Sequence, residues 1–412
     1  MKNKASGLNS INSTFNGSKR EPFYNWYNFI QGYSPDFVKS IIKNYMPDAK
    51  KILDPFGGTV TTGFVSIELN KNGFYCEINP VLNFIADVKS RVRILSSEEK
   101  NVMAKKIIKL STILPKAIDI KPADETLNKT YQEIFKNSKF FDSVTFRKVL
   151  ISRTLINDIY KEDKLLSDLL CVAVLSSLIP SSLMKLQGDL RYKTTTELKK
   201  IVPDFIQILE NKLKAMSKDI SNDKLKLKKK PILVCENAKD LDKINGLFFD
   251  GVITSPPYLN GTNYFRNTKL ELWFLGCLKT KDDLKNYRKM ALTAGINDVQ
   301  GEYKIPVTYA LKNTIKALEE KAYDKRIPKM VSNYFSEIED IFLKLKKHLV
   351  KNTKLAIDIG DSEYAGIRIQ TDKFLIEILK SIGYKHLSTI KLRERFSKNN
   401  DKLTQVLLIF EN

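Results

Sequence analysis

The stretch "KKILDPFGGTVTTGFVSIELNKNGFYCEINP", residues 50–80, changes its pattern three times. An apolar run ends at Asp54 and Pro55, two glycines follow, "TTGFVSIEL" has helical spacing, and "GFYCEI" is a second apolar run that ends at Glu77. Strand, tight turn, helix and strand of this length form a βαβ unit, whose strands are parallel and whose ligand crevice lies at their carboxyl ends. The stretch therefore predicts an α/β fold with a mostly parallel sheet.

The alternation of strands and helices is interrupted once. After residue 91 the sequence changes to long helical stretches such as "LLSDLLCVAVLSSLIPSSLMK", and strand patterns return after residue 230 with "PILVCENAKDL" and "GLFFDGVITSPPY". We therefore predict one α/β domain built from residues 21–91 and 231–412, with a helical inserted subdomain at residues 92–230. Residues 1–20 are polar and rich in Asn, Ser and Gly, and are predicted to be a flexible N-terminus.

The composition limits which binding partners and which cellular compartment are expected. Lys and Arg number 69 against 47 Asp and Glu, a net charge of +22, which suggests a polyanion such as nucleic acid, although a lysine-rich solvated surface would give the same excess. The four cysteines are far apart, lack Cys-x-x-Cys spacing and have only two histidines to join them, so no metal site is predicted. No signal peptide or long apolar span is evident, so we expect a cytoplasmic protein without a membrane partner.

The first strand and turn favour a nucleoside ligand. Glycines let the backbone approach the ligand, and an acidic side chain at the end of the next strand can accept both ribose hydroxyls. Nicotinamide sites show Gly-x-Gly-x-x-Gly and P-loops end in Gly-Lys-Ser/Thr, and "DPFGGTVTTG" matches neither well. We therefore predict S-adenosylmethionine, with Glu77 on the ribose and Asp54 facing the amino group.

A second motif, "TSPPY" at residues 254–258, follows another apolar run. Its prolines fix the backbone, remove two N–H donors and leave carbonyls as acceptors. Ser255 Oγ and the Pro256 carbonyl could hold both hydrogens of an exocyclic amine, which draws the nitrogen toward tetrahedral geometry and frees its lone pair for a methyl group. Tyr258 offers a face on which an extruded base can stack. The predicted catalytic residues are Ser255, Pro256, Pro257 and Tyr258.

Each of these features also has an ordinary structural explanation. Asp54 with Pro55 could be a strand-ending turn, Glu77 a solvated charge, and residues 255–258 a rigid loop. Their order on successive predicted strand ends favours one shared site.

With "DPFGGTVTTGF" and "TSPPY", the chain resembles the DNA amino-methyltransferases, which modify cytosine N4 or adenine N6. The catalytic motif of that family is [Asp/Asn/Ser]-Pro-Pro-[Tyr/Phe], and its serine form is commonest among the cytosine-N4 enzymes. The resemblance implies a Rossmann-like methyltransferase fold, S-adenosylmethionine as cofactor, and double-stranded DNA with a flipped base as substrate. Val60 occupies the second glycine position of the cofactor motif, as a non-glycine residue does in some cytosine-N4 members.

The resemblance also assigns residues around the cofactor. "FIQGYSP" resembles the segment that closes over the methionine tail, and "CENAKDL" resembles the motif beside the adenine. The cofactor-binding residues that this implies are Tyr33, Ser34, Pro35, Asp54, Phe56, Gly58, Glu77, Asn237, Ala238 and Asp240.

Candidates for nucleic-acid contact lie outside these motifs. Arg191, Tyr192 and Lys193 are predicted in a loop between helices, which could reach phosphates or bases or could be a solvated turn. Tyr264 is a candidate for the base pocket or for the core. Arg288 could close over a flipped base or belong to a disordered lid.

The predicted function is that of a site-specific DNA methyltransferase, acting on cytosine N4, in a bacterial or archaeal restriction-modification or other defence system. A cognate restriction endonuclease is a further expected partner, and the protein would be associated with the nucleoid. Three alternatives stay open: an adenine-N6 DNA methyltransferase, an RNA or tRNA base methyltransferase, and a non-catalytic nucleic-acid-binding paralogue. RNA enzymes usually carry an N-terminal RNA-binding domain, whereas about 20 residues precede the α/β domain here.

Overall fold

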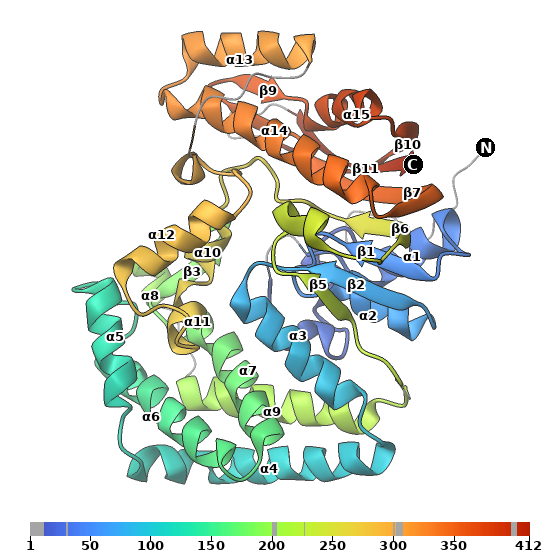
Figure 1. The fold of residues 1–412 in the computed structure, drawn as a ribbon. Coiled ribbons are helices and arrows are strands. Elements are labelled where there is room, and N and C mark those ends of the chain that lie inside the picture. The colour runs from blue at the N-terminus through green and yellow to red at the C-terminus, as the bar shows by residue number, and fades with distance from the viewer. Residues whose placement is uncertain are drawn as a thin grey trace.

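A computed structural model of the protein describes residues 12–29, 32–199, 204–225, 227–299, 301, 308–396 and 402–412. Its centre is a seven-stranded sheet with the order β10-β11-β7-β6-β1-β2-β5 (Figure 1). The strands, in chain order, are β1 (Lys51–Asp54), β2 (Asn72–Cys76), β5 (Ile232–Cys235), β6 (Phe249–Thr254), β7 (Leu349–Gly360), β10 (Lys385–Phe396) and β11 (Lys402–Glu411).

Most pairs of neighbouring strands are parallel, and only β11 runs antiparallel to both of its neighbours, β7 and β10. The predicted βαβ unit is present: β1, the helix α2 (Thr61–Glu68), and β2, which pairs with β1 in parallel from Lys51 to Asp54. The prediction of an α/β, Rossmann-like fold with a mostly parallel sheet is confirmed.

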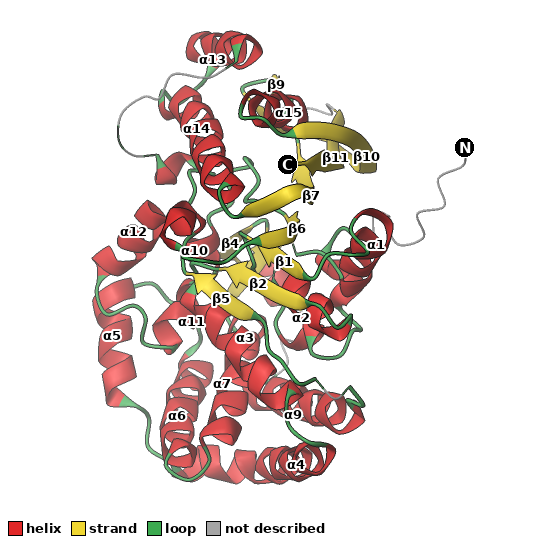
Figure 2. Ribbon diagram, turned by 45° about the vertical axis from the view of Figure 1, so that its right-hand side comes forward, coloured by secondary structure: helices red, strands yellow, loops and turns green. Residues whose placement is uncertain are grey.

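Helices cover both faces of the sheet, because successive apolar side chains along a strand point to opposite faces and each face has to be buried. On β1, Ile52 packs with α1 (Pro35–Tyr45) and α2, whereas Leu53 faces α14 (Arg326–Lys346) on the opposite side. Also on the second side are η3 (Ala238–Lys243), α13 (Tyr309–Lys321) and α15 (Thr371–Ser381). Figure 2 shows α13, α14 and α15 at the β7 and β11 end of the sheet and a separate group of helices beyond the β5 end.

That separate group lies within residues 92–230. It comprises α4 (Ser97–Ile120), α5 (Glu125–Phe135), α6 (Ser143–Tyr160), α7 (Lys164–Ser181), the hairpin β3 (Met184–Gln187) and β4 (Asp189–Tyr192), α8 (Thr195–Leu198) and α9 (Phe205–Asn222). α3 (Pro80–Arg93), which follows β2, packs against α7. α7 is long and apolar enough to cross a membrane, but 67% of its apolar window is buried among the other helices, so it is the core helix of this group.

The remaining elements follow the motif at residues 254–258 or precede β1. They are η1 (Phe15–Ser18), η2 (Tyr24–Trp26), α10 (Tyr264–Asn267), α11 (Lys269–Phe274), α12 (Lys281–Met290), η4 (Ile296–Asp298), β8 (Ser362–Tyr364) and β9 (Ile367–Ile369). Arg288 therefore lies on a helix, in contrast to the disordered lid that was one of its two predicted settings.

The beginning of the chain also differs from its prediction. Residues 1–11 lie outside the described part, but residues 12–20 are ordered against the domain as turns and η1. The Ser34 amide donates to the Asn12 carbonyl at 2.8 Å, and Ser18 is buried. The polar composition of residues 12–20 predicted a flexible segment. In the structure, a hydrogen bond to Ser34, just before α1, helps to hold the segment in place.

Candidate active site

A cavity of about 1160 Å³, including its part open to solvent, lies where four parallel strands end. Its walls come from the segments after β1, β2, β5 and β6, as expected for the carboxyl edge of such a sheet. We call it the first cavity. The predicted site residues that line it are Tyr33, Phe56, Gly58, Glu77, Asn237, Ala238, Ser255, Pro256, Pro257, Tyr264 and Arg288.

Glu77 is held at the wall of the first cavity by two backbone amides. Gly58 N–H donates to Oε2 and Asn79 N–H donates to Oε1, both at 2.7 Å. Burial raises the pKa of Glu77 to about 7, although these hydrogen bonds lower it. The two amides thus fix the orientation of the carboxylate before any ligand arrives. They do not fully compensate the ionised carboxylate for its burial, because its pKa remains raised.

Asp54 occupies a different position from the predicted one. It is 1% exposed and does not line the cavity. Its carboxylate accepts hydrogen bonds from the Tyr33 hydroxyl and the Thr254 hydroxyl, both at 2.7 Å, and from the Phe56 amide at 3.0 Å. Through these three hydrogen bonds, Asp54 ties β1, β6 and the segment before α1 together beneath the cavity.

The glycine turn is followed by a valine with unusual backbone angles. Val60 has φ 62° and ψ 32°, in the left-handed region that β-branched residues avoid, and caps the start of α2. Its side chain is fully buried, and a side chain at Gly63 would come within 2.8 Å of it. The backbone therefore has a conformation that glycine adopts readily, and burial of the valine offsets the strain.

Three other predicted cofactor residues lie outside the cavity lining. Ser34 is buried and caps α1 by accepting from the Phe37 amide, and Pro35 is the first residue of that helix. Asp240 lies on η3 and forms an ion pair with Lys243 at 2.7 Å. All three residues thus contribute to the local structure of the segments that carry Tyr33 and Asn237.

The motif at residues 254–258 separates two cavities. Ser255, Pro256 and Pro257 line the first cavity, whereas Tyr258 lines a second cavity of about 730 Å³, including its part open to solvent. Phe29 lines both. The four residues predicted to act together therefore form the partition between two spaces.

Tyr258 is held rigidly at this partition. A side chain at position 360 would lie 3.2 Å from its ring, so Gly360 allows the ring to pack on β7. Burial and the neighbouring Asp358 carboxylate raise the pKa of the Tyr258 phenol, which also interacts with the Ser255 side chain. The ring is 6% exposed.

Asp358 links this tyrosine to the end of the chain. Gln405 Nε2 donates to both Asp358 oxygens, at 2.7 and 2.9 Å, and Gln405 Oε1 accepts from Arg393 Nε. Burial raises the pKa of Asp358 to about 7, and the hydrogen bonds and the Arg393 charge oppose that shift. Sequence reasoning missed Asp358, Arg393 and Gln405, because their strands are distant from the motif along the chain.

Tyr264 and Arg288 lie on the far wall of the first cavity. The ring of Tyr264 lies 6.1 Å from that of Phe29, centroid to centroid, and Arg288 is on α12 near Asp298. Burial raises the pKa of Asp298 to about 6. Phe29 and Asp298 were not predicted as site residues. Phe29 stands in the quoted segment "FIQGYSP" and could have been included on that basis, whereas Asp298 carries no motif signal.

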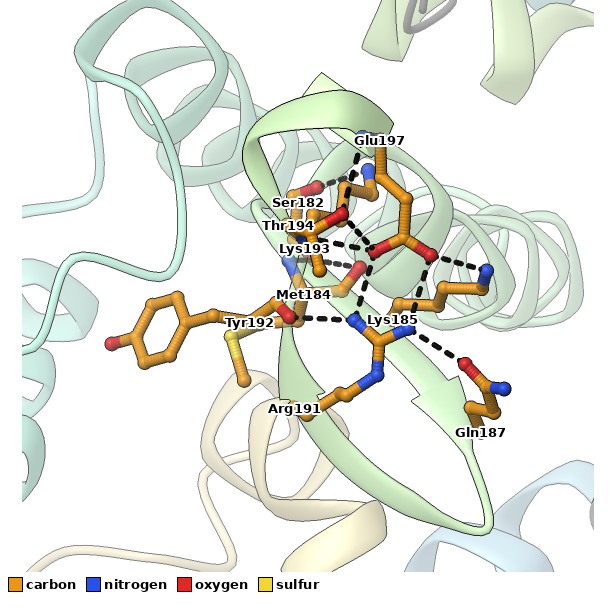
Figure 3. Close-up of polar contacts among 9 residues, drawn as sticks. All are labelled: Ser182, Met184, Lys185, Gln187, Arg191, Tyr192, Lys193, Thr194 and Glu197. Carbon is orange, nitrogen blue, oxygen red and sulfur yellow. Dashed lines mark hydrogen bonds and ion pairs between the residues drawn. The ribbon is translucent and has the colours of Figure 1, made fainter. Parts of the chain in front are cut away.

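Arg191, Tyr192 and Lys193 were predicted in a loop between helices, and the structure contradicts this. Arg191 and Tyr192 belong to β4 of the hairpin, and Lys193 follows it directly. The Arg191 guanidinium donates to both Glu197 carboxylate oxygens and to Gln187 Oε1, and Lys185 also pairs with Glu197 (Figure 3). Arg191 is therefore engaged within the protein.

The hairpin supports the wall of the first cavity. Leu190 N–H donates to Asn267 Oδ1 at 2.8 Å, and Asn267 Nδ2 donates to the Gly188 carbonyl at 3.0 Å. Asp189 accepts from the amide of Asn263, which lines the cavity. The inserted helical group thus reaches the segment that follows the motif at residues 254–258.

Within the described residues, no group of three or more His, Cys, Asp or Glu side chains could hold a metal ion.

Comparison with known proteins relates most of the chain to curated enzymes. The Type II methyltransferase M.BsoBI of Geobacillus stearothermophilus is 24% identical over 95% of this chain and 84% of the relative. The Type II methyltransferase M.AvaI of Nostoc sp. strain PCC 7120 is 23% identical over 90% of this chain and 81% of the relative. No protein-family model matches the chain. No solved structure matches it significantly.

Proposed function

The chain belongs to a DNA methyltransferase family, and from this premise we propose that it transfers a methyl group from S-adenosylmethionine to the N4 amine of cytosine in double-stranded DNA. The observation that carries the proposal is the Ser255–Tyr258 partition, with the first cavity and its Glu77 carboxylate on one side and the Tyr258 ring on the other. The serine form of the motif, commonest in the cytosine-N4 enzymes that the chain resembles, favours cytosine over adenine.

The first cavity fits S-adenosylmethionine by its donor and acceptor set. Glu77 offers an oriented carboxylate for two ribose hydroxyls, and Gly58, with φ 54° and no Cβ, brings the backbone to the cavity surface. Asn237 and Ala238 line the part of the cavity after β5. When bound, the cofactor supplies an electrophilic methyl group on a positively charged sulfur.

The chain's own residues prepare the amine. Ser255 Oγ and the Pro256 carbonyl would accept hydrogen bonds from its two N–H groups, which shifts the nitrogen lone pair out of conjugation with the ring. As the nitrogen bonds to the methyl carbon, the carbon–sulfur bond would break to leave a neutral thioether, and one amine proton would be lost to water. Tyr258, supported by Gly360 and Asp358, presents its ring to a base extruded from the duplex. These contacts matter most in the transition state, when the charge and geometry of the nitrogen change.

The Type II methyltransferase names of the relatives support a further part of the proposal. We infer that the protein protects specific DNA sites in the cytoplasm as the modification half of a restriction-modification system, beside a cognate endonuclease. The proposed flipping of the target base follows from the same reasoning, since the clamp cannot reach an amine inside the base stack.

The test is methylation-aware sequencing of DNA from cells that express the chain, followed by single-turnover assays on the site found. We expect N4-methylcytosine at one short sequence, and N6-methyladenine would overturn the choice of base.

Ser255→Ala should lower the single-turnover rate by about 100-fold or more, because a donor or acceptor aimed at the transition state is lost. S-adenosylmethionine affinity, measured by calorimetry, should be unchanged. A wild-type rate in this variant would overturn the clamp.

A further inference from the structure

The second cavity contains polar groups that the clamp does not use. Its lining, apart from Tyr258 and Phe29, comes from the start of the chain and from the last two strands: Ser13, Thr14, Phe15, Asn16, Lys19, Asn28, Arg393 and Gln405. Under the proposed function, on which this inference rests, a base stacked on Tyr258 holds its amine at Ser255 and turns the rest of its edge toward this wall.

Arg393 is the half-buried cation of that wall, and its orientation is fixed by a chain of hydrogen bonds. Gln405, its cross-strand neighbour, directs its amide nitrogen to Asp358 and its amide oxygen to Arg393 Nε. Asp358 in turn contacts Tyr258. The guanidinium is therefore oriented by the same network that holds the stacking ring.

The guanidinium lacks a carboxylate partner within the described part of the chain. Two nearby lysines, Lys391 on β10 and Lys402 on β11, do have such a partner, because both form ion pairs with Glu394. The interaction of Arg393 with Asp358 passes through Gln405, and its terminal nitrogens have no hydrogen-bond acceptor among the described residues. An arginine with unused donors in a cavity wall suits a ligand that brings acceptors.

A base held by its amine brings such acceptors. Beside its N4 amine, cytosine carries N3 and O2, which accept hydrogen bonds and donate none, and adenine carries N1 beside its N6 amine. We propose that Arg393 is a specificity-determining residue, which donates to the ring acceptors of the flipped target base. Gln405 is its positioning residue.

An arginine near DNA can also bind a phosphate, and that contact carries no base information. The two roles are separated by removing the base. Duplexes are made that contain the methylation site found for the wild-type protein, with the target nucleotide either intact or replaced by an abasic residue. Binding is measured with S-adenosylhomocysteine present, for the wild type and for Arg393→Met.

We expect Arg393→Met to weaken binding of the intact duplex by about tenfold or more, the effect of losing a base-edge contact, and to leave the abasic duplex nearly unaffected. Arg393→Lys, which keeps the charge but loses the planar pair of donors, should fall between. Lys391→Met removes a charge from the same strand, outside the cavity lining, and should weaken both duplexes equally and slightly.

Equal losses on both duplexes in Arg393→Met would overturn the inference in favour of a phosphate contact, and no loss on either would overturn it altogether. Unchanged S-adenosylhomocysteine affinity shows that a variant is folded, and Arg393→Lys serves if Arg393→Met is not. If the wild-type protein neither binds nor methylates DNA, the proposed function fails instead, so the two failures are distinguishable.

Discussion

Glu77 carries a pH dependence that follows from its burial. Its pKa is raised from 4.5 to about 7, with the nearby Asp54 carboxylate adding to the effect of burial. A carboxyl whose folded pKa is raised binds its proton more tightly in the folded state, so the ligand-free protein loses stability as pH rises from 4.5 to about 7. Ribose hydroxyls donate to the ionised carboxylate. Ligand affinity should therefore increase with pH, whereas the stability of the ligand-free protein decreases.

We therefore expect the affinity for S-adenosylmethionine to increase as pH rises from about 6 to about 8, through the raised pKa of Glu77. Glu77→Gln should weaken binding by about 10- to 100-fold, as expected for lost hydrogen bonds to a charged group, and should flatten the pH profile. Calorimetry at three pH values measures both effects.

Glu271 provides the matched control. Burial also raises its pKa to about 7, but it accepts a hydrogen bond from Tyr27 and does not line the first cavity. Glu271→Gln should keep the wild-type pH profile of cofactor affinity. If the profile flattens in Glu271→Gln and persists in Glu77→Gln, the ribose assignment is wrong.

Val60 shows what a motif can and cannot predict about one residue. The family motif has a glycine at this position, and the structure has a left-handed backbone there, which glycine adopts readily. The sequence does not reveal the compensation: a left-handed valine costs about 1–2 kcal/mol, and burial of its side chain contributes about 1.5–3 kcal/mol. That balance depends on Gly63 and its surroundings, which only packing defines.

The β3–β4 hairpin is an element that the sequence analysis missed, although a signal was present. In "LMKLQGDLRYK", residues 183–193, polar and apolar residues alternate on both sides of Gly188. Gly188 has φ 75°, and Gln187 pairs with Asp189 across it. The long helical patterns on either side led us to predict a loop. Short strands within helical sequence are poorly marked by periodicity, because few residues set the period.

The Glu197 network should control how firmly this hairpin is closed. Glu197→Gln removes the charge that holds Arg191 and Lys185, so we expect faster amide hydrogen exchange in residues 184–193. Global thermal stability should change little, because the network is exposed to solvent. Hydrogen exchange with mass spectrometry measures the first, and calorimetry the second.

Asp324→Asn is a suitable comparison, because Asp324 forms a similar exposed ion pair with Arg326 far from the hairpin in sequence. It should leave exchange in residues 184–193 unchanged. Unaltered exchange in Glu197→Gln as well would mean that the contacts with Asn263 and Asn267 alone hold the hairpin.

Across the whole molecule, the first cavity was largely predictable and the second was not. The first is formed by segments that follow successive strands, so motif order and topology place Glu77, Asn237 and Ser255 together. The second joins residues 13–19 to Tyr258 and to β10 and β11, segments from both ends of the chain. Nothing in the local pattern of any of these segments predicts the others as neighbours.

The net charge of +22 belongs to the molecule as a whole and leads to the broadest prediction. If lysines and arginines neutralise phosphates, counterions are released from DNA on binding, and affinity must fall steeply as salt is added. For duplex DNA without the target site, we expect affinity to drop by about a thousandfold between about 50 and 200 mM salt, as for several phosphate contacts. Fluorescence anisotropy of a labelled duplex measures this drop. The Arg393→Met variant should show the wild-type salt dependence on that duplex, because the proposed contact of Arg393 is to a base. An affinity that hardly changes with salt would mean that the excess charge is spread over surfaces that do not meet DNA.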